Sequence, residues 1–401
     1  MDIVLVTSGV KNIRNKTQYQ HSELLVNKHD TTIISKSQVA SDIKEKSENT
    51  HCFQNWPGSG FLFPYWAILV TLYYYLLSGY DIIYTTHSTQ CIFAGVVSLF
   101  LDVRWVADIW DDPRLGRQIN KYGKNNRGEF IPDKPYSTIF SHSALKLLRF
   151  CDLAILSISS DIYSTWDVDI KNENILQVTN GVDIEYVRSI TDTSEENGTE
   201  LEDRTKIVYV GHVSKARGVD VILEVAKLLQ KNMNSSFEIK LIGPIDDIDN
   251  KWLDTEVRTH ELEDSFKITG VLSHTSAINE IRSSDICINI LDNSVENYEY
   301  AYPIKLFEYM ALGKAIISTR TTGVEEILGN ENSSILLEEN NPEQIAEHIQ
   351  ILSNNPQFRQ YLGRNAKRHS ENFDWRCIRK EINSELWKLC NKRTARLRRN
   401  R

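Results

Sequence analysis

Short apolar runs rich in Val and Ile alternate with longer segments of helical periodicity along most of the chain. Such near-continuous runs are typical of parallel strands that are covered on both faces, and the segments between them suit crossover helices. The pattern therefore predicts two doubly wound α/β lobes, with a ligand cleft beside the carboxyl ends of both sheets. The predicted strands are 3–6, 32–35, 81–84, 103–108, 153–157 and 175–178 in the first lobe, and 206–209, 238–242, 266–269, 285–290, 315–318 and 334–337 in the second.

The boundary between the lobes is visible in the composition. Residues 191–204 (TDTSEENGTELEDR) are polar and acidic, as expected of an exposed linker. We therefore predict an N-terminal, acceptor-binding lobe over 1–190 and a C-terminal lobe over 205–370. The remainder, 371–401, is expected to form a helix that packs back on the N-terminal lobe, followed by a basic tail.

Composition and charge narrow the class of protein. The 401 residues are 41% hydrophobic and 25% charged, which excludes a disordered or fibrous chain. Acidic residues outnumber basic ones, 54 to 46, so a protein that coats nucleic acid is not expected. The six cysteines form no CxxC pair, which argues against a zinc or redox motif. The N-terminus lacks a basic region followed by a long apolar stretch, so we expect a cytoplasmic location.

One uncharged stretch complicates this picture. Residues 53–80 carry no charge, and 61–77 read FLFPYWAILVTLYYYLL. Seventeen residues interrupted by Pro64 are short for a membrane span. A buried helix packed on a sheet is the simpler interpretation, and an aromatic face on an anionic membrane surface is the alternative. The tail from Lys388 to Arg401, where seven of fourteen residues are basic, leaves the same two choices: a solvated end or a lipid-headgroup contact.

The segment KIVYVGHVSKARGVDVILEVAKLL (206–229) has the features of a phosphate site. A predicted strand ends at Gly211, a short loop carries Lys215 and Arg217, and Gly218 opens an amphipathic helix. A strand-end glycine lets a ligand approach the backbone, and the helix N-terminus offers free N–H groups. The spacing is not GxGxxG, so a dinucleotide fingerprint is not predicted, and taken alone the charges also suit an ordinary surface.

A second segment, YPIKLFEYMALG (302–313), predicts one short helix. Pro303 suits the first helical position and Gly313 suits the stop. The carboxylate of Glu308 is able to accept both hydroxyl hydrogens of a ribose cis-diol. The alternative is a surface pair between Lys305 and Glu308, worth only tenths of a kcal/mol (about 0.2–0.5).

Together these segments resemble retaining glycosyltransferases with the GT-B fold, family 4, in which two Rossmann-like lobes face each other across a cleft. The resemblance covers nearly the whole chain, through motifs in the family's order. They are CDLAILSISS (151–160), NGVD (180–183), YVGHVSKARGVD (209–220), FEIKLIGPID (237–246), FKITGVLS (266–273), PIKLFEYMALGKAIIST (303–319) and NFDW (372–375).

The resemblance implies a donor site in the C-terminal lobe. Arg217 matches the basic residue that binds the donor diphosphate, and Glu308 matches the ribose carboxylate. The family's usual arginine after the strand-end glycine is His212 here, so Lys215 is expected to substitute. Tyr300 stands where the family commonly has a glutamate that contacts the donor sugar. The remaining donor-binding candidates are Gly9, Gly211, Gly218, Pro303 and Lys305.

In the N-terminal lobe, the loop that holds Gly9 is expected near the reacting centre. Asp108 matches a polar residue that follows a central strand in the family, and we count it with Arg217 and Glu308 as catalytic; a structural N-cap role competes. Asp108, Asp111 and Asp112 do not form a DxD motif, and GT-B enzymes use helix dipoles and basic side chains instead of a divalent cation. No metal and no cofactor are expected.

The resemblance implies transfer of a sugar from a nucleoside diphosphate sugar to a hydroxyl acceptor. The aromatic stretch favours a glycan or lipid-linked glycan acceptor of cell-envelope biosynthesis, handled at the inner face of the membrane. Two other functions stay open. One is a sugar-nucleotide epimerase on the same fold, which needs no acceptor. The other is a non-catalytic nucleotide-sugar-binding subunit, which Tyr300 keeps under consideration.

Overall fold

A computed structural model gives the fold of the chain. It describes residues 1–11, 16–53, 59–86, 89–112, 142–166, 168–193, 204–233, 236–292, 295–329 and 332–399, some of them, including 392–399, by their backbone alone. The chain divides into two compact units. The first is Met1–Asn180 with Trp375–Arg401, and the second is Gly181–Asp374.

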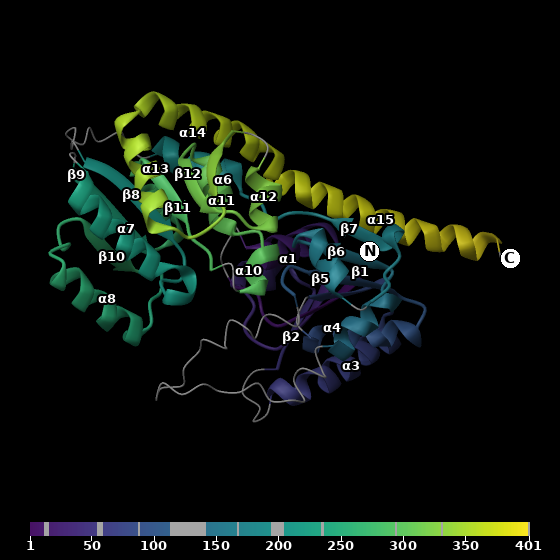
Figure 1. Ribbon diagram of the computed structural model, residues 1–401. Helices are drawn as coiled ribbons and strands as arrows, with labels where there is room; N and C mark the ends of the chain where they lie inside the picture. The colour runs from purple at the N-terminus through teal and green to yellow at the C-terminus, as the bar shows by residue number, and fades with distance from the viewer. Residues whose placement is uncertain are drawn as a thin grey trace. The chain divides into compact units, whose positions relative to one another are not determined.

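The first unit is built on a parallel sheet of seven strands in the order β3-β2-β1-β4-β5-β6-β7. Figure 1 labels β1, β2, β5, β6 and β7 of this sheet. The strands are β1 (Asp2–Thr7), β2 (Asp30–Ser35), β3 (Asn49–Cys52), β4 (Ile82–Thr86), β5 (Arg104–Ile109), β6 (Leu153–Leu156) and β7 (Ile175–Gln177). Alternate residues of β1 enter two different cores: Ile3 and Leu5 pack with α1 (Thr17–Lys28), α2 (Ser41–Lys46) and α15 (Trp375–Arg399). On the other face, Val4 and Val6 pack with α3 (Ser59–Leu77), α4 (Thr89–Ile92) and η1 (Phe93–Leu99). Helices therefore cover both faces of this sheet.

The second unit repeats this plan with six parallel strands in the order β10-β9-β8-β11-β12-β13. They are β8 (Arg204–Val210), β9 (Ser236–Ile242), β10 (Phe266–Gly270), β11 (Ile286–Asn289), β12 (Ala315–Thr319) and β13 (Ser334–Leu337). Ile207 and Tyr209 of β8 face the core formed with α7 (Val219–Asn232), α8 (Asp247–Thr259) and α13 (Pro342–Asn354). Val208 faces the opposite core, formed with α6 (Ile184–Thr193), α9 (His274–Ser283), α11 (Ile304–Ala311), α12 (Thr322–Leu328) and α14 (Pro356–Ser370).

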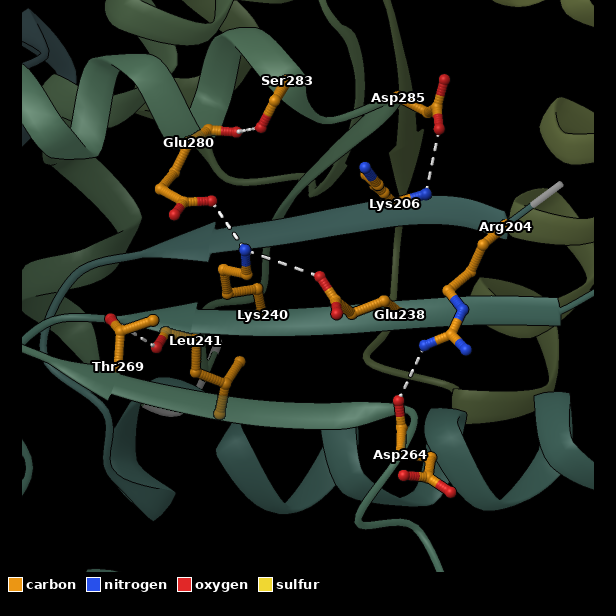
Figure 2. Close-up of polar contacts among 10 residues, drawn as sticks. All are labelled: Arg204, Lys206, Glu238, Lys240, Leu241, Asp264, Thr269, Glu280, Ser283 and Asp285. Atoms are coloured by element: carbon orange, nitrogen blue, oxygen red, sulfur yellow. Dashed lines mark hydrogen bonds and ion pairs between the residues drawn. The ribbon is translucent and has the colours of Figure 1, made fainter. Parts of the chain in front are cut away.

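Polar contacts tie the strands of the second sheet to one another and to α9 (Figure 2). Lys240 of β9 contacts Glu280 of α9 at 2.7 Å and Glu238 at 3.5 Å. The backbone N–H of Lys206 donates to the Asp285 carboxylate at 2.9 Å, and Arg204 donates to the Asp264 carbonyl at 3.0 Å. The bonds of Lys206 and Arg204 hold the start of β8, the strand whose carboxyl end carries the candidate site.

The prediction of two doubly wound lobes is confirmed. Every predicted strand is present, with ends that differ by two residues or fewer. The pattern missed β3, whose sequence NTHC is polar. This strand lies at the edge of the sheet, where one side has no strand neighbour among the described residues and continuous apolar character is not required.

The division of the chain differs from the predicted one. The second unit begins at Gly181, not after residue 190, because α6 places Ile184, Val187 and Ile190 in the core of the second sheet. Of the predicted linker, 191–193 end α6 and Arg204 begins β8, while 194–203 lie outside the described residues. The helix predicted within 371–401 runs from Trp375 to Arg399 as α15, and it packs in the first unit through Trp375, Ile378, Ile382 and Leu386.

The uncharged stretch forms α3, which is half buried. Phe63, Ala67 and Thr71 face the core of the first unit. The opposite side of the helix is exposed and consists of Leu62, Tyr65, Leu69, Tyr73, Leu76 and Leu77. Within the described residues, no helix combines the length and the apolar character that crossing a membrane requires.

Candidate functional site

The candidate site is built at the carboxyl end of β8, the central strand of the second sheet. Gly211 follows this strand with φ 147°, and Gly218 follows η7 (Lys215–Arg217) with φ 75° and precedes α7. A Cβ on Gly218 would lie 2.5 Å from Cγ2 of Ile290. Both positions favour glycine because of their positive φ, and Gly218 also lacks space for a side chain. The resulting turn brings the N-terminus of α7 next to the end of the strand.

Lys305 of α11 has an unusual environment at this end of the sheet. Its amine is enclosed 4.0 Å above the ring of Tyr209, and among the described residues no hydrogen-bond partner reaches it. Burial, together with the neighbouring Arg217, holds the pKa of Lys305 well below its usual value of 10.5. A Cβ on Gly211 would lie 3.1 Å from the Tyr209 hydroxyl and 3.4 Å from this amine, so a glycine here lets the backbone pass close to both groups.

Arg217 completes a pair of cations with Lys305. Its guanidinium carbon lies 4.6 Å from the ring centre of Tyr298, which holds the planar group in place. Arg217 contributes to the lowered pKa of Lys305, and two basic groups this close together form an environment that favours an anion. The pair lies beside helix α7, whose N-terminus attracts negative charge as well.

Two other predicted donor residues point elsewhere. The amine of Lys215 lies 4.0 Å above the ring of Trp252 of α8. His212 lies 3.6 Å from the carboxylate of Asp246, and both side chains are exposed. The structure thus gives Lys305, rather than Lys215, the place beside Arg217.

Glu308 lies on α11, one turn beyond Lys305, and is 6% exposed. One carboxylate oxygen, Oε1, is 2.7 Å from Nε2 of His274, the first residue of α9. The His274 ring stacks on Tyr186 of α6, with ring centres 5.4 Å apart and planes 16° apart. The alternative of a surface pair between Lys305 and Glu308 does not fit, since the carboxylate pairs with His274 and the amine is buried.

Tyr300 ends α10 (Glu296–Tyr300), next to the helix that carries Lys305 and Glu308. Glu299 accepts hydrogen bonds from the backbone N–H and the hydroxyl of Thr322, at 2.9 and 2.5 Å, and so caps the start of α12. It therefore does not replace the carboxylate that the family has at the position of Tyr300. Pro303 was predicted to be the first residue of this helix, but it directly precedes α11 instead. Gly313 follows the helix with φ 65°.

Asp108 lies in the first unit and is fully buried on β5. Its Oδ2 is 2.8 Å from Nδ1 of His21 on α1, and His21 packs edge-on against Trp375 of α15. Tyr84 lies beside this pair, and burial next to the carboxylate raises its pKa well above the usual value. The contact with His21 links β5 to α1, so an N-cap role does not describe Asp108, and its catalytic role stays a prediction.

The loop after β1 is held by Gln18, which donates to Thr7 Oγ1 at 3.0 Å and also to the Gly9 carbonyl. Gly9 has φ 139°, a conformation that favours glycine. Asp112 accepts a bond of 2.9 Å from the indole N–H of Trp166, which gives it a structural partner. No group of three or more His, Cys, Asp or Glu side chains with metal-binding geometry occurs within the described ranges.

Sequence reasoning missed two residues, His21 and His274. His21 is 87 positions from Asp108, and His274 is 34 positions from Glu308. Neither pair has a local motif. The nearest sequence signal to His274 is the motif FKITGVLS (266–273), whose last residue, Ser273, caps α9.

The second unit thus combines a cationic pair, a helix N-terminus and a buried carboxylate at one end of its sheet. Solved structures share the fold of the chain. The Anabaena protein Alr3699/HepE, crystallised with UDP, aligns with a TM-score of 0.73 at 15% identity, over 97% of this chain and all of that one. The fold is GT-B.

The second unit also matches a family profile. Residues 191–369 match glycosyl transferases group 1, in agreement with the prediction of a glycosyltransferase. An uncharacterized glycosyltransferase of Methanocaldococcus jannaschii, MJ1069, is 26% identical over 224 residues, 55% of each protein. CapM, a capsular polysaccharide biosynthesis glycosyltransferase of Staphylococcus aureus, is 22% identical over 253 residues, 60% of this chain and 62% of CapM. The chain spans about half the length of the first of these relatives and somewhat more of the second.

Proposed function

We propose that this GT-B protein transfers a sugar from a nucleoside diphosphate sugar to a hydroxyl acceptor, with retention at the anomeric carbon. The observation that carries the proposal is the amine of Lys305, which is buried beside Arg217 and has no hydrogen-bond partner among the described residues. A buried cation without a counter-ion is unfavourable in the empty protein and becomes favourable when an anion arrives. Retention rests on the resemblance to family 4.

The proposed mechanism follows from where charge develops. When the bond between the sugar and the diphosphate breaks, negative charge grows on the departing phosphate oxygens. Lys305, Arg217 and the N-terminus of α7 would stabilise that charge without having to reorganise. Glu308 would hold the nucleoside through the ribose diol. We expect no metal to be required, because two cations and a helix dipole supply positive charge at this place.

The base and the acceptor are part of the proposal. The complex of Alr3699/HepE with UDP makes a uridine carrier the first choice to test. The role of CapM in capsular polysaccharide biosynthesis supports a cell-envelope glycan as the acceptor. Tyr300, in place of a glutamate, would then change the contacts to the donor sugar.

We further propose that the exposed side of α3 rests on a membrane surface where a lipid-linked acceptor is presented. Its exposed residues follow helical spacing, no charge interrupts the helix, and Leu76 is 82% exposed. Phe100, 80% exposed, follows η1, which packs against α3. Leucines with tyrosines among them suit the interfacial layer of a bilayer.

Binding calorimetry with UDP, GDP, ADP and dTDP tests the donor site. We expect one diphosphate to bind at micromolar strength, with at least a tenfold loss in Glu308→Ala and in Lys305→Met. The control is Glu224→Ala on the exposed face of α7, which should bind like the wild type. Absence of binding by every diphosphate would refute the proposal, and donor binding without transfer or hydrolysis would indicate the binding subunit instead.

Sedimentation with vesicles of neutral or anionic lipid tests the membrane surface. Leu69→Ser combined with Leu76→Ser should reduce the bound fraction severalfold. The control is Ile248→Ser, which changes an exposed apolar residue of the second unit. Equal binding of both variants would rule out α3 as the contact.

A further inference from the structure

His274 is tied to Glu308 more firmly than a surface histidine would be. It opens α9, whose N-cap Ser273 accepts a hydrogen bond from the N–H of Ser276 at 3.1 Å. The imidazole contacts Glu308 Oε1 through Nε2 and stacks on Tyr186, whose hydroxyl lies 3.1 Å from that of Thr275. Three helices, α6, α9 and α11, therefore fix the position of one carboxylate oxygen.

We propose that His274 is a positioning residue that sets the plane of the Glu308 carboxylate for recognition of the nucleoside ribose. This deepens the proposed function and rests on it. A free glutamate side chain samples several rotamers, and ordering it on binding lowers the affinity. A carboxylate is planar, so a bond to Oε1 restricts where Oε2 lies. A diol is bound well only when two acceptor directions match its hydroxyls.

The same geometry offers an opposite role for His274. The imidazole could occupy the place of the ribose in the empty site, and it would then compete with the nucleotide. The two roles give opposite results when the ring is removed. A positioning residue strengthens nucleotide binding, whereas a competitor weakens it.

The test compares UDP with 2′-deoxy-UDP by calorimetry on the full chain. The wild type should bind UDP at least tenfold more tightly than the deoxy form. His274→Ala should weaken UDP binding about tenfold and change deoxy binding little, so that the preference for ribose disappears. His274→Gln, whose amide nitrogen reaches a similar position, should restore most of that preference. A purely structural effect of the substitution would lower the affinity for UDP and for 2′-deoxy-UDP alike.

His260→Ala is the control, because this histidine at the end of α8 also lies near a glutamate, 3.6 Å from Glu256, in a pair that is more exposed than that of His274 and Glu308. It should leave both affinities unchanged. Tighter UDP binding by His274→Ala, or an unchanged ribose preference in both His274 variants, overturns this inference while the donor site stands. If the wild type binds UDP without any ribose preference, the inference also fails. If it binds no nucleoside diphosphate at all, the proposed function fails with it.

Discussion

The two sheets differ in how they keep a buried ionisable group near their carboxyl ends. In the first unit, Oδ2 of Asp108 meets Nδ1 of His21 at 2.8 Å, while Asp108 Oδ1 and His21 Nε2 have no hydrogen-bond partner among the described residues. In the second unit, Lys305 has a cation, Arg217, as its charged neighbour and no hydrogen-bond partner among the described residues. A paired group of this kind holds the fold together, whereas an unpartnered one is explained best by a ligand that arrives from outside.

Lys314 shows that the difference does not come from burial alone. This lysine of the second unit is also largely buried, and burial lowers its pKa. Its amine nevertheless donates to the carbonyl oxygens of Arg282 and Ser284, at 2.5 and 2.7 Å. The protein thus satisfies one buried lysine with its own backbone and leaves the other, at the candidate donor site, open.

The largest expected effect comes from breaking the paired group. Asp108→Ala leaves His21 Nδ1 buried without its acceptor and should lower the free energy of unfolding by about 3 kcal/mol. Urea denaturation measures the change. Asp161→Ala, at an exposed position of the same unit, is the control and should change stability by less than about 0.5 kcal/mol. A similar small loss for Asp108→Ala would show that the pair does not hold the first unit together.

Removing the amine of Lys305 should change the free energy of unfolding in the opposite direction. Lys305→Met keeps the length of the side chain and should stabilise the nucleotide-free protein by about 1 kcal/mol, while it abolishes stabilisation by nucleotide. Lys314→Met should destabilise the protein, because it leaves two carbonyl groups without their donor. Thermal unfolding of both variants, with and without UDP, measures these effects. If both substitutions stabilise the protein, or both destabilise it, the contrast between the two lysines is contradicted.

The Lys305 effect should also depend on pH. Because its pKa is lowered in the folded state, the unfolded chain binds the proton more readily between that lowered pKa and 10.5. The wild type therefore loses stability as the pH falls through this window. The advantage of Lys305→Met over the wild type should be smallest above pH 10.5 and largest once the pH is below the lowered pKa.

The smallest expected effect concerns the glycine whose backbone passes close to the amine. Gly211→Ala should cost about 1 kcal/mol through its positive φ and should also weaken UDP binding, because its Cβ would lie 3.4 Å from Lys305 Nζ. Gly79→Ala is the matched control, since Gly79 has φ 69° and nothing lies within 4 Å of its added Cβ. It should lose similar stability and no affinity. Equal affinities for both variants would argue that the ligand does not lie next to Gly211.

The fold could be predicted from the sequence because parallel strands covered on both faces must be apolar at nearly every position. This held for β8 and β12 and failed for β3, which lies at an edge and is polar. The start of the second unit was misplaced for a different reason. Residues 191–204 are acidic, but the core contacts of the second sheet already begin with Ile184 on α6.

The candidate site was predictable only where a local motif carried it. Gly211, Gly218 and Arg217 belong to one strand–turn–helix segment, and Glu308 belongs to one helix. The burial of Lys305 depends on the Tyr209 ring from a strand almost a hundred residues earlier. The partners of Asp108 and Glu308 come from other helices, at separations that periodicity and spacing do not reveal.

The order of segments along the chain has a consequence for synthesis. The second unit is continuous, and its ends meet where the N–H of Val182 donates to the carbonyl of Phe373 at 2.9 Å. The first unit is interrupted by it and receives Trp375, the ring that packs on His21, only afterwards. During translation the second unit is therefore complete while the first still lacks part of its core. The lobe that is made first is the last to be able to finish folding.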